Sequence, residues 1–257
     1  MQNKKVNFIF LLLWPIIASV LCFSFSLNGL ESVLVYYVLP SLYVSYLLPK
    51  RIKKTAFFAL AGALIWISLD YVWELTGAWV VVSAFSTKLL GNISIESVVW
   101  VYVWIYWIII CYQYFWDKKN SVIETRKRTY GLFMLGLFTI IALSICVYKI
   151  GLNLYIPYSY LILGTIACLL PSLSIYFYFP SLRKKLVSAG IYFMYATILY
   201  EGTALSLHYW YFPSIGQFIF LLPLFGYYIP IEEIIIWIIF GSTAVIGLYE
   251  LLDDDEK

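Results

Sequence analysis

The sequence predicts an all-α integral membrane protein of about eight transmembrane helices, built from two parallel four-helix repeats. Hydrophobic residues make up 63% of its 257 residues, and the mean hydropathy is +0.88. Charged residues are only 12%, whereas a soluble domain averages about 25%. Since no soluble core could bury so much apolar surface, the lipid bilayer is an expected partner. Nucleic acid is not expected as a partner.

Apolar runs of about 20 residues, the length that crosses the hydrocarbon as a helix, occur along the whole chain. They are too long, and alternate too little, for the strands of a membrane barrel. The first run lacks a small-x-small cleavage site and holds Trp14 and Pro15, which favours a retained span over a signal peptide. The expected spans are 6–28, 31–49, 55–75, 93–116, 129–148, 155–179, 186–207 and 229–252.

The basic residues predict the orientation. With eight spans, fifteen of them lie on one side and only Lys88 and Lys149 lie on the other. The positive-inside rule then places both termini in the cytoplasm of a multi-pass cell-membrane protein. The fifteen are Lys4, Lys5, Lys50, Arg51, Lys53, Lys54, Lys118, Lys119, Arg126, Lys127, Arg128, Arg183, Lys184, Lys185 and Lys257.

An internal repeat appears when the chain is compared with itself at an offset of 131 residues. The matched residues are Leu39-Pro40-Ser41-Leu42 with Leu170-Pro171-Ser172-Leu173, Pro49 with Pro180, Lys53-Lys54 with Lys184-Lys185, Asp70 with Glu201, and Trp79 with Trp210. An offset of 136 places Ile95-Glu96 on Ile231-Glu232. Duplicated membrane proteins usually have their functional site at the repeat interface. We therefore expect repeats at 1–128 and 129–257, the second with an acidic C-terminal tail.

Six acidic residues are predicted to lie in the outer part of the membrane. Asp70 and Glu201 each follow a pair of lysines by sixteen residues, which is roughly 24 Å along a helix in a hydrocarbon layer of about 30 Å. Ionisable groups are costly there, and paired carboxyl groups suit acid/base chemistry. The six are Asp70, Glu74, Glu96, Glu201, Glu232 and Glu233.

Structural roles remain open for several of these residues. Glu96, Glu232 and Glu233 open helices, where a carboxylate interacts favourably with the helix dipole. Glu74 and His208 fit a wet interface equally well. The four cysteines lie in apolar runs and are expected to be buried thiols, and a single histidine excludes a multi-histidine metal site. No metal or other cofactor is expected.

Trp79 and Trp210 fit two uses. Tryptophan is common in the aromatic belts of membrane proteins, and the sequence has 10 Trp and 24 Tyr. Their matched spacing also fits a pocket, where an aromatic face stabilises a cation. The loop 211–228 is apolar and rich in Pro and Gly, so it is expected on the outer surface or as a lid over a site.

Taken in order, these motifs resemble the lycopene cyclase domain family, small membrane carotenoid cyclases with paired or fused repeats. The best match is Ile229-Pro230-Ile231-Glu232-Glu233, followed by Thr76-Gly77-Ala78-Trp79, and the resemblance covers about 31–115 and 162–252. The first half departs from the pattern at Ser94-Ile95-Glu96-Ser97, which lacks the Pro and the second Glu. The second half departs at Leu207-His208-Tyr209-Trp210.

The resemblance implies cyclisation of a linear polyene end by protonation, carbocation ring closure and deprotonation, a lyase- or isomerase-type reaction without redox change. It implies an acid/base set of Glu232, Glu233 and Glu96, shared or supported by Asp70 and Glu201. Substrate contacts are expected from Glu74, Trp79, Trp210 and His208. The partner would be a hydrophobic polyene or other isoprenoid, and the protein could form oligomers.

Two other functions remain open at this stage. Intramembrane carboxylates and duplicated halves also suit a proton-coupled transporter. Against a transporter, the acids cluster at one level, and no path of polar residues descends to the other side. The replacement of the second glutamate by Ser97 also allows a non-catalytic isoprenoid-binding protein.

Overall fold

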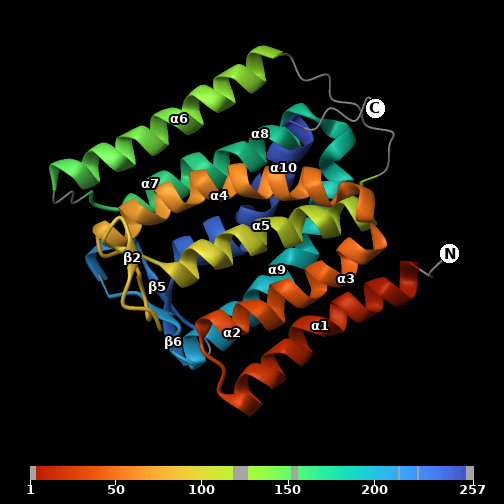
Figure 1. Ribbon diagram of the computed structural model, residues 1–257, viewed down its shortest axis with the longest axis horizontal. Coiled ribbons are helices and arrows are strands. Elements are labelled where there is room, and N and C mark those ends of the chain that lie inside the picture. The colour runs from red at the N-terminus through yellow and green to blue at the C-terminus, as the bar shows by residue number, and fades with distance from the viewer. Residues whose placement is uncertain (1–3, 118–126, 152–155, 214, 225, 253–257) are drawn as a thin grey trace.

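The computed structural model describes residues 4–117, 127–151, 156–213, 215–224 and 226–252 of the chain. These residues are mostly helical, in agreement with the predicted fold class (Figure 1). The predicted acidic tail and part of the basic segment around 118–126 lie outside the described residues.

Eight long helical segments follow one another in the described part of the chain. Six are long and apolar enough to cross a membrane, judged by length and composition, and α6 and α9 occur where the other two spans are predicted. In chain order they are α1 (Lys4–Phe25); α2 (Gly29–Val33), η1 (Leu34–Val38) and α3 (Leu39–Leu47); α4 (Ile52–Leu75); α5 (Ile95–Phe115); α6 (Lys127–Ile150); α7 (Ser159–Gly164), η3 (Thr165–Leu169) and α8 (Leu170–Tyr178); α9 (Arg183–Ser206); and η6 (Glu233–Gly241) with α10 (Ser242–Leu252).

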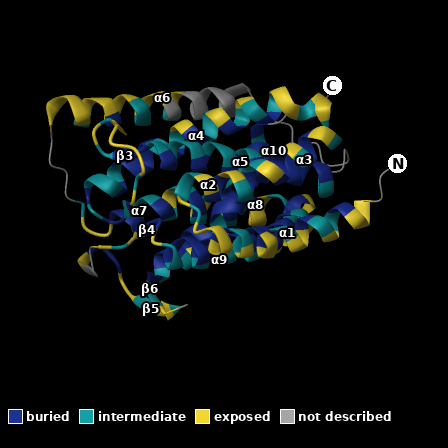
Figure 2. Cartoon of the chain, turned by 60° about the horizontal axis from the view of Figure 1, so that its bottom comes forward, coloured by how far each residue is buried: buried dark blue, intermediate teal, exposed yellow. Residues whose placement is uncertain are grey.

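Helix α5 lies at the centre of the bundle, where it packs against α3, α4 and α10. Most of its residues are buried, including Trp104 and Trp107. Helices α1 and α6 lie at the edges, and their outward faces are exposed (Figure 2). Cys146 faces outward on α6, so the expectation of four buried thiols is wrong for this residue, whereas Cys22, Cys111 and Cys168 are buried.

Short strands occupy one end of the bundle, and both chain ends lie at the opposite end (Figure 1). The spans predicted from 93 and 229 each begin with two strand residues, and their helices start at 95 and 231. The apolar loop 211–228 contains a 3-10 turn, η5 (Ile215–Gln217), and most of a hairpin. The strands are β1 (Val80–Val81), β2 (Lys88–Leu89), β3 (Ile93–Ser94), β4 (Trp210–Tyr211), β5 (Leu221–Leu224) and β6 (Tyr227–Pro230), and the antiparallel pairs are β1–β4, β2–β3 and β5–β6.

The same local structures recur in two parts of the chain. A five-residue π-helical segment precedes each Leu-Pro pair, at η1 and at η3. Since Pro40 and Pro171 have no N–H to donate, the regular hydrogen-bond ladder is interrupted there. A 3-10 turn then follows at η2 (Pro49–Arg51) and η4 (Pro180–Leu182), and a 24-residue helix follows each turn.

Charged residues link three helices at the end opposite the strands. The Lys185 ammonium lies 3.4 Å from Glu250 and 3.6 Å from Asp117. The Tyr112 hydroxyl also donates a hydrogen bond to Glu250. The start of α9 is thereby joined to the ends of α5 and α10.

Gly247 provides a test of the bundle packing. A Cβ atom at this position would lie 2.1 Å from the Ile175 side chain, so α8 and α10 approach more closely than a larger residue allows. We expect Gly247→Leu to lower the free energy of unfolding by about 1–3 kcal/mol, measured by thermal or denaturant unfolding in detergent. Gly136→Leu is the matched control, because a Cβ atom there meets nothing within 4 Å. Equal stability of the two variants would contradict the close α8–α10 packing.

Candidate active site

Two buried carboxyl groups each accept a hydrogen bond from a tryptophan nine residues later in the chain. The Trp79 indole N–H donates to Asp70 at 2.8 Å, and the Trp210 indole N–H donates to Glu201 at 3.0 Å. Asp70 and Glu201 are each only 1% exposed. The β1–β4 pairing joins the segments that follow Trp79 and contain Trp210, so it brings the two carboxyl–indole pairs to the same end of the bundle.

Glu96 and Glu232 bind the loops that precede their helices. Glu96 accepts hydrogen bonds from the Ala84 N–H at 2.6 Å and from the Ser83 hydroxyl at 2.7 Å. Glu232 accepts one from the Ile219 N–H at 2.6 Å. Both contacts hold a backbone segment, so these two glutamates order the loops over the strand end.

Glu233 lies one residue further and has a different partner. It is the first residue of η6, it is 2% exposed, and the Tyr160 hydroxyl donates a hydrogen bond to it. The Tyr160 ring packs against Trp73, with 4.8 Å between the ring centroids. A phenol and a carboxyl group are therefore fixed together within an aromatic environment.

Indole rings surround these carboxyl groups. Trp104 stacks on Trp237 at 4.2 Å between ring centroids, and Trp66 and Trp100 lie 4.8 and 4.9 Å from the same ring. A cavity of about 10 Å³, room for about one water molecule, lies among them. It is lined by Trp66, Trp73, Trp79, Trp100, Tyr160, Glu201, Trp210, Glu233 and Trp237, and we call it the acid cavity.

The acid cavity therefore contains two carboxyl groups, from Glu201 and Glu233. One oxygen of Glu201, Oε2, has no hydrogen-bond partner within the part of the chain that the structure describes. No lysine, arginine or histidine lines this cavity among the described residues. A charge on either carboxyl group is costly in a buried site without a balancing cation. The arrangement thus provides a proton donor and a proton acceptor beside one small apolar space.

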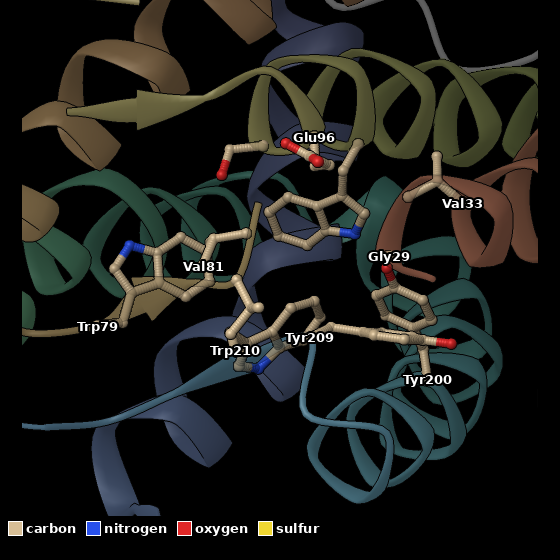
Figure 3. A pocket seen from close by; sticks show the side chains of 11 residues that line it. Gly29, Val33, Trp79, Val81, Glu96, Tyr200, Tyr209 and Trp210 are labelled. Carbon is tan, nitrogen blue, oxygen red and sulfur yellow. The ribbon is translucent and has the colours of Figure 1, made fainter. Parts of the chain in front are cut away.

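A second cavity, of about 20 Å³, lies beside the first and shares Trp79, Trp100 and Trp210 with it. Figure 3 shows side chains from several elements around it, with Glu96 on one side and Trp79 and Trp210 across from it. Its lining residues are Gly29, Val33, Trp79, Val81, Val82, Glu96, Ser97, Trp100, Tyr200, Tyr209 and Trp210, and we call it the glycine cavity.

The residues proposed from the sequence thus fall into different places. Glu201, Glu233 and Trp210 line the acid cavity, as does Trp79, whose indole binds Asp70. Glu96 lines the glycine cavity, and Glu232 binds a loop. Glu74 is partly buried and lines neither cavity. His208 is exposed, with its ring 6.1 Å from Tyr227, and it also lies outside both.

Sequence reasoning did not select the other aromatic residues of the acid cavity. These are Trp66, Trp73, Trp100, Tyr160 and Trp237. The high tryptophan count was the available signal, but it also fits an interfacial belt. The structure distinguishes the cavity from the belt, because Trp66 and Trp237 lie within helices and are buried.

Comparisons with protein-family models, with curated proteins and with solved structures found no match. The structure itself defines a class, namely a helical protein with membrane-length apolar helices and a tryptophan-lined cavity that holds two carboxyl groups at one end.

Proposed function

We propose that this protein is a membrane cyclase that closes a ring at the end of a linear isoprenoid polyene, as lycopene cyclases do, without redox change. The observation that carries the proposal is the position of Glu201 and Glu233 in one cavity whose other walls are aromatic. Acid/base catalysis needs a donor and an acceptor beside the reacting atoms, and an uncharged polyene needs apolar walls.

The two carboxyl groups have different surroundings, which supports different roles. Glu201 Oε2 has no hydrogen-bond partner among the described residues, so we assign it the hydroxyl of a neutral acid. Glu233 accepts the Tyr160 hydroxyl, and such a bond stabilises a carboxylate. Glu201 is therefore the proposed proton donor, and Glu233 the proposed base.

In the proposed reaction, the Glu201 O–H bond breaks and its proton forms a C–H bond at the terminal C=C. The resulting tertiary carbocation accepts the π electrons of a second double bond in the same chain, which forms the ring C–C bond and moves the cation into the ring. Glu233 removes a proton from a neighbouring carbon, and that C–H electron pair becomes a new C=C. The product is an isomer of the substrate, and a proton returns from Glu233 to Glu201 before the next turnover.

The indole rings have a specific part in this reaction. An aromatic face attracts a cation by roughly 0.5 to 2 kcal/mol, and more when water is excluded. Trp79, Trp100, Trp210 and Trp237 all line the acid cavity. They support the cation without reacting with it, and they exclude the water that would capture it.

The proposal also includes the topology. Eight spans in two parallel repeats, with both termini in the cytoplasm, would place the strand end and its cavities at the outer side of the membrane. The recurring π-helical segments, 3-10 turns and carboxyl–indole pairs support the duplication. Within this topology, Lys88 and Lys149 remain the basic residues on the outer side.

The proposed activity is tested by expression in a host that accumulates lycopene, with extraction and chromatography of the pigments. We expect ring-bearing pigments of unchanged molecular mass in the host that expresses the wild-type protein. The host that carries the empty vector should contain acyclic pigment alone. Membrane insertion is checked by immunoblotting of the same fractions. Unchanged lycopene in membranes that contain the correctly inserted protein would exclude this substrate. Proton-coupled uptake of a charged solute into vesicles that contain the protein would favour a transporter.

A further inference from the structure

A groove of about 350 Å³ lies between α8, α9 and the segment formed by η6 and α10. Its volume lies within the range for small-molecule sites. The groove shares no lining residue with the acid cavity or the glycine cavity, so it is a separate feature of the bundle. It is lined by Ser172, Leu173, Tyr176, Leu186, Val187, Gly190, Met194, Ile239, Phe240 and Thr243, and we call it the α9 groove.

The polar groups inside the α9 groove are already hydrogen-bonded. The Ser172 hydroxyl donates to the Phe240 carbonyl at 3.1 Å and lies 2.9 Å from the Thr243 hydroxyl. Thr243 donates to the same carbonyl at 2.9 Å. Most of the other lining side chains are aliphatic or aromatic, and none of the described lining residues is charged. The interior of the groove therefore suits an apolar chain.

Basic residues lie at one end of the α9 groove, at the start of α9. The Arg183 guanidinium lies 5.3 Å from the centre of the Tyr176 ring, which lines the groove. It donates to the carbonyls of Tyr176 at 2.7 Å and Phe177 at 3.1 Å, which uses two of the five N–H donors of a guanidinium. Lys184 is exposed and precedes the lining residue Val187 by three positions, so both lie on the same side of α9. One end of the groove is thus cationic.

The first half of the chain contains a groove of the same construction. It has a volume of about 260 Å³ and lies between α3, the start of α4 and α5. Ser41-Leu42 in this groove corresponds to Ser172-Leu173 in the α9 groove at the offset of 131 residues. The exposed Lys53 follows Ile52, which lines the first groove. The duplicated fold therefore places basic residues beside an apolar groove in both halves.

We propose that the α9 groove binds an anionic phospholipid, with one acyl chain in the groove and the phosphate group at Arg183 and Lys184. The acyl chain matches the apolar walls, and the phosphate has the charge that the basic end attracts. A free phosphate would use only the basic end, and an uncharged isoprenoid would use only the groove. A phospholipid uses both. The proposal does not depend on the cyclase activity, because the groove shares no residue with either cavity.

The site is tested by photo-crosslinking of the full-length protein in phosphatidylcholine nanodiscs. The probe is phosphatidylglycerol with a diazirine in one acyl chain, and phosphatidylcholine with the same chain is the reference. Labelled peptides are mapped by mass spectrometry. We expect the anionic probe to label peptides of α8, α9 and α10 about tenfold more than the reference does, because two cations attract its headgroup. The outward face of α1 should be labelled equally by both probes.

Two pairs of variants separate the headgroup contacts from the groove. The double variant Arg183→Gln and Lys184→Gln should lower labelling by the anionic probe to the level of the reference. The double variant Lys88→Gln and Lys149→Gln removes the same charge from exposed residues elsewhere and should leave the preference unchanged.

Val187→Trp should lower labelling of the groove about fivefold or more, because the indole occupies the space of the acyl chain. Val20→Trp is its matched control, because Val20 is an exposed valine on α1. This control should keep the wild-type labelling pattern. The charge variants change only surface residues, so they still test the site if Val187→Trp does not fold.

Four results would overturn the proposal. The first is equal labelling of the groove by the two probes, and the second is an unchanged preference after loss of Arg183 and Lys184. The third is competition by inorganic phosphate as strong as that by unlabelled phosphatidylglycerol, which would indicate a phosphate site. The fourth is equally strong competition by farnesol, which would assign the groove to an isoprenoid.

Discussion

Glu201→Gln is expected to lower the rate of ring formation by about a thousandfold, the middle to upper part of the range that a positioned general acid provides. Glutamine is close to glutamate in shape and keeps an oxygen that accepts the Trp210 N–H, so the hydrogen bond of 3.0 Å can persist. It has no carboxylic proton to transfer to the polyene. The initial rate of cyclic pigment formation in isolated membranes measures the effect.

Two matched variants separate the loss of the proton from a loss of structure. Glu31→Gln makes the same substitution in an exposed helix cap, where the side chain accepts the Asn28 N–H at 2.8 Å, and it should keep wild-type activity. Glu232→Gln removes a buried carboxylate next to Glu233, but an amide oxygen can still accept the Ile219 N–H. We expect Glu232→Gln to retain about a tenth or more of the activity. A loss in Glu232→Gln equal to that in Glu201→Gln would contradict the assignment of the donor.

Some parts of this site follow from local sequence rules. Helix positions were predictable because runs of about 20 apolar residues and their flanking lysines define membrane-length segments. The matching positions of Asp70 and Glu201 in two helices of 24 residues follow from their equal distance from the preceding lysines. The matched spacing indicated that Asp70 and Glu201 are each followed by a tryptophan nine residues later, but it did not predict the hydrogen bonds between them.

Other parts depend on contacts between distant segments. Tyr160 and Glu233 are 73 residues apart, and no periodicity connects them. The β1–β4 pairing joins two strands of two residues each, too short for a strand signal. The different contacts of Glu232 and Glu233 could not be predicted either. Adjacent residues at a helix start point in different directions, and only the surrounding loops show which one faces the cavity.

Glu233→Gln should change the product as well as the rate. After ring closure, the cation can lose a proton from more than one neighbouring carbon, and the position of the base selects which carbon is deprotonated. Without the carboxylate, we expect about a hundredfold slower ring formation and a mixture of double-bond isomers, because weaker bases then remove the proton. Chromatographic separation of the ring isomers, with nuclear magnetic resonance assignment of the new C=C, measures the distribution.

Tyr160→Phe tests how Glu233 is held. This variant keeps the ring that packs on Trp73 and removes only the hydroxyl that donates to Glu233. The freed carboxyl group loses its fixed direction, so we expect a smaller fall in rate, about tenfold, with a shift in the same isomer ratio. A variant that slowed the reaction but left the isomer ratio unchanged would show that Tyr160 supports the fold and not the direction of the base. If Glu233→Gln also left the isomer ratio unchanged, another group would have to remove the proton. Asp70 would then be the next candidate, because it is a carboxyl group bound to Trp79, which lines the same cavity.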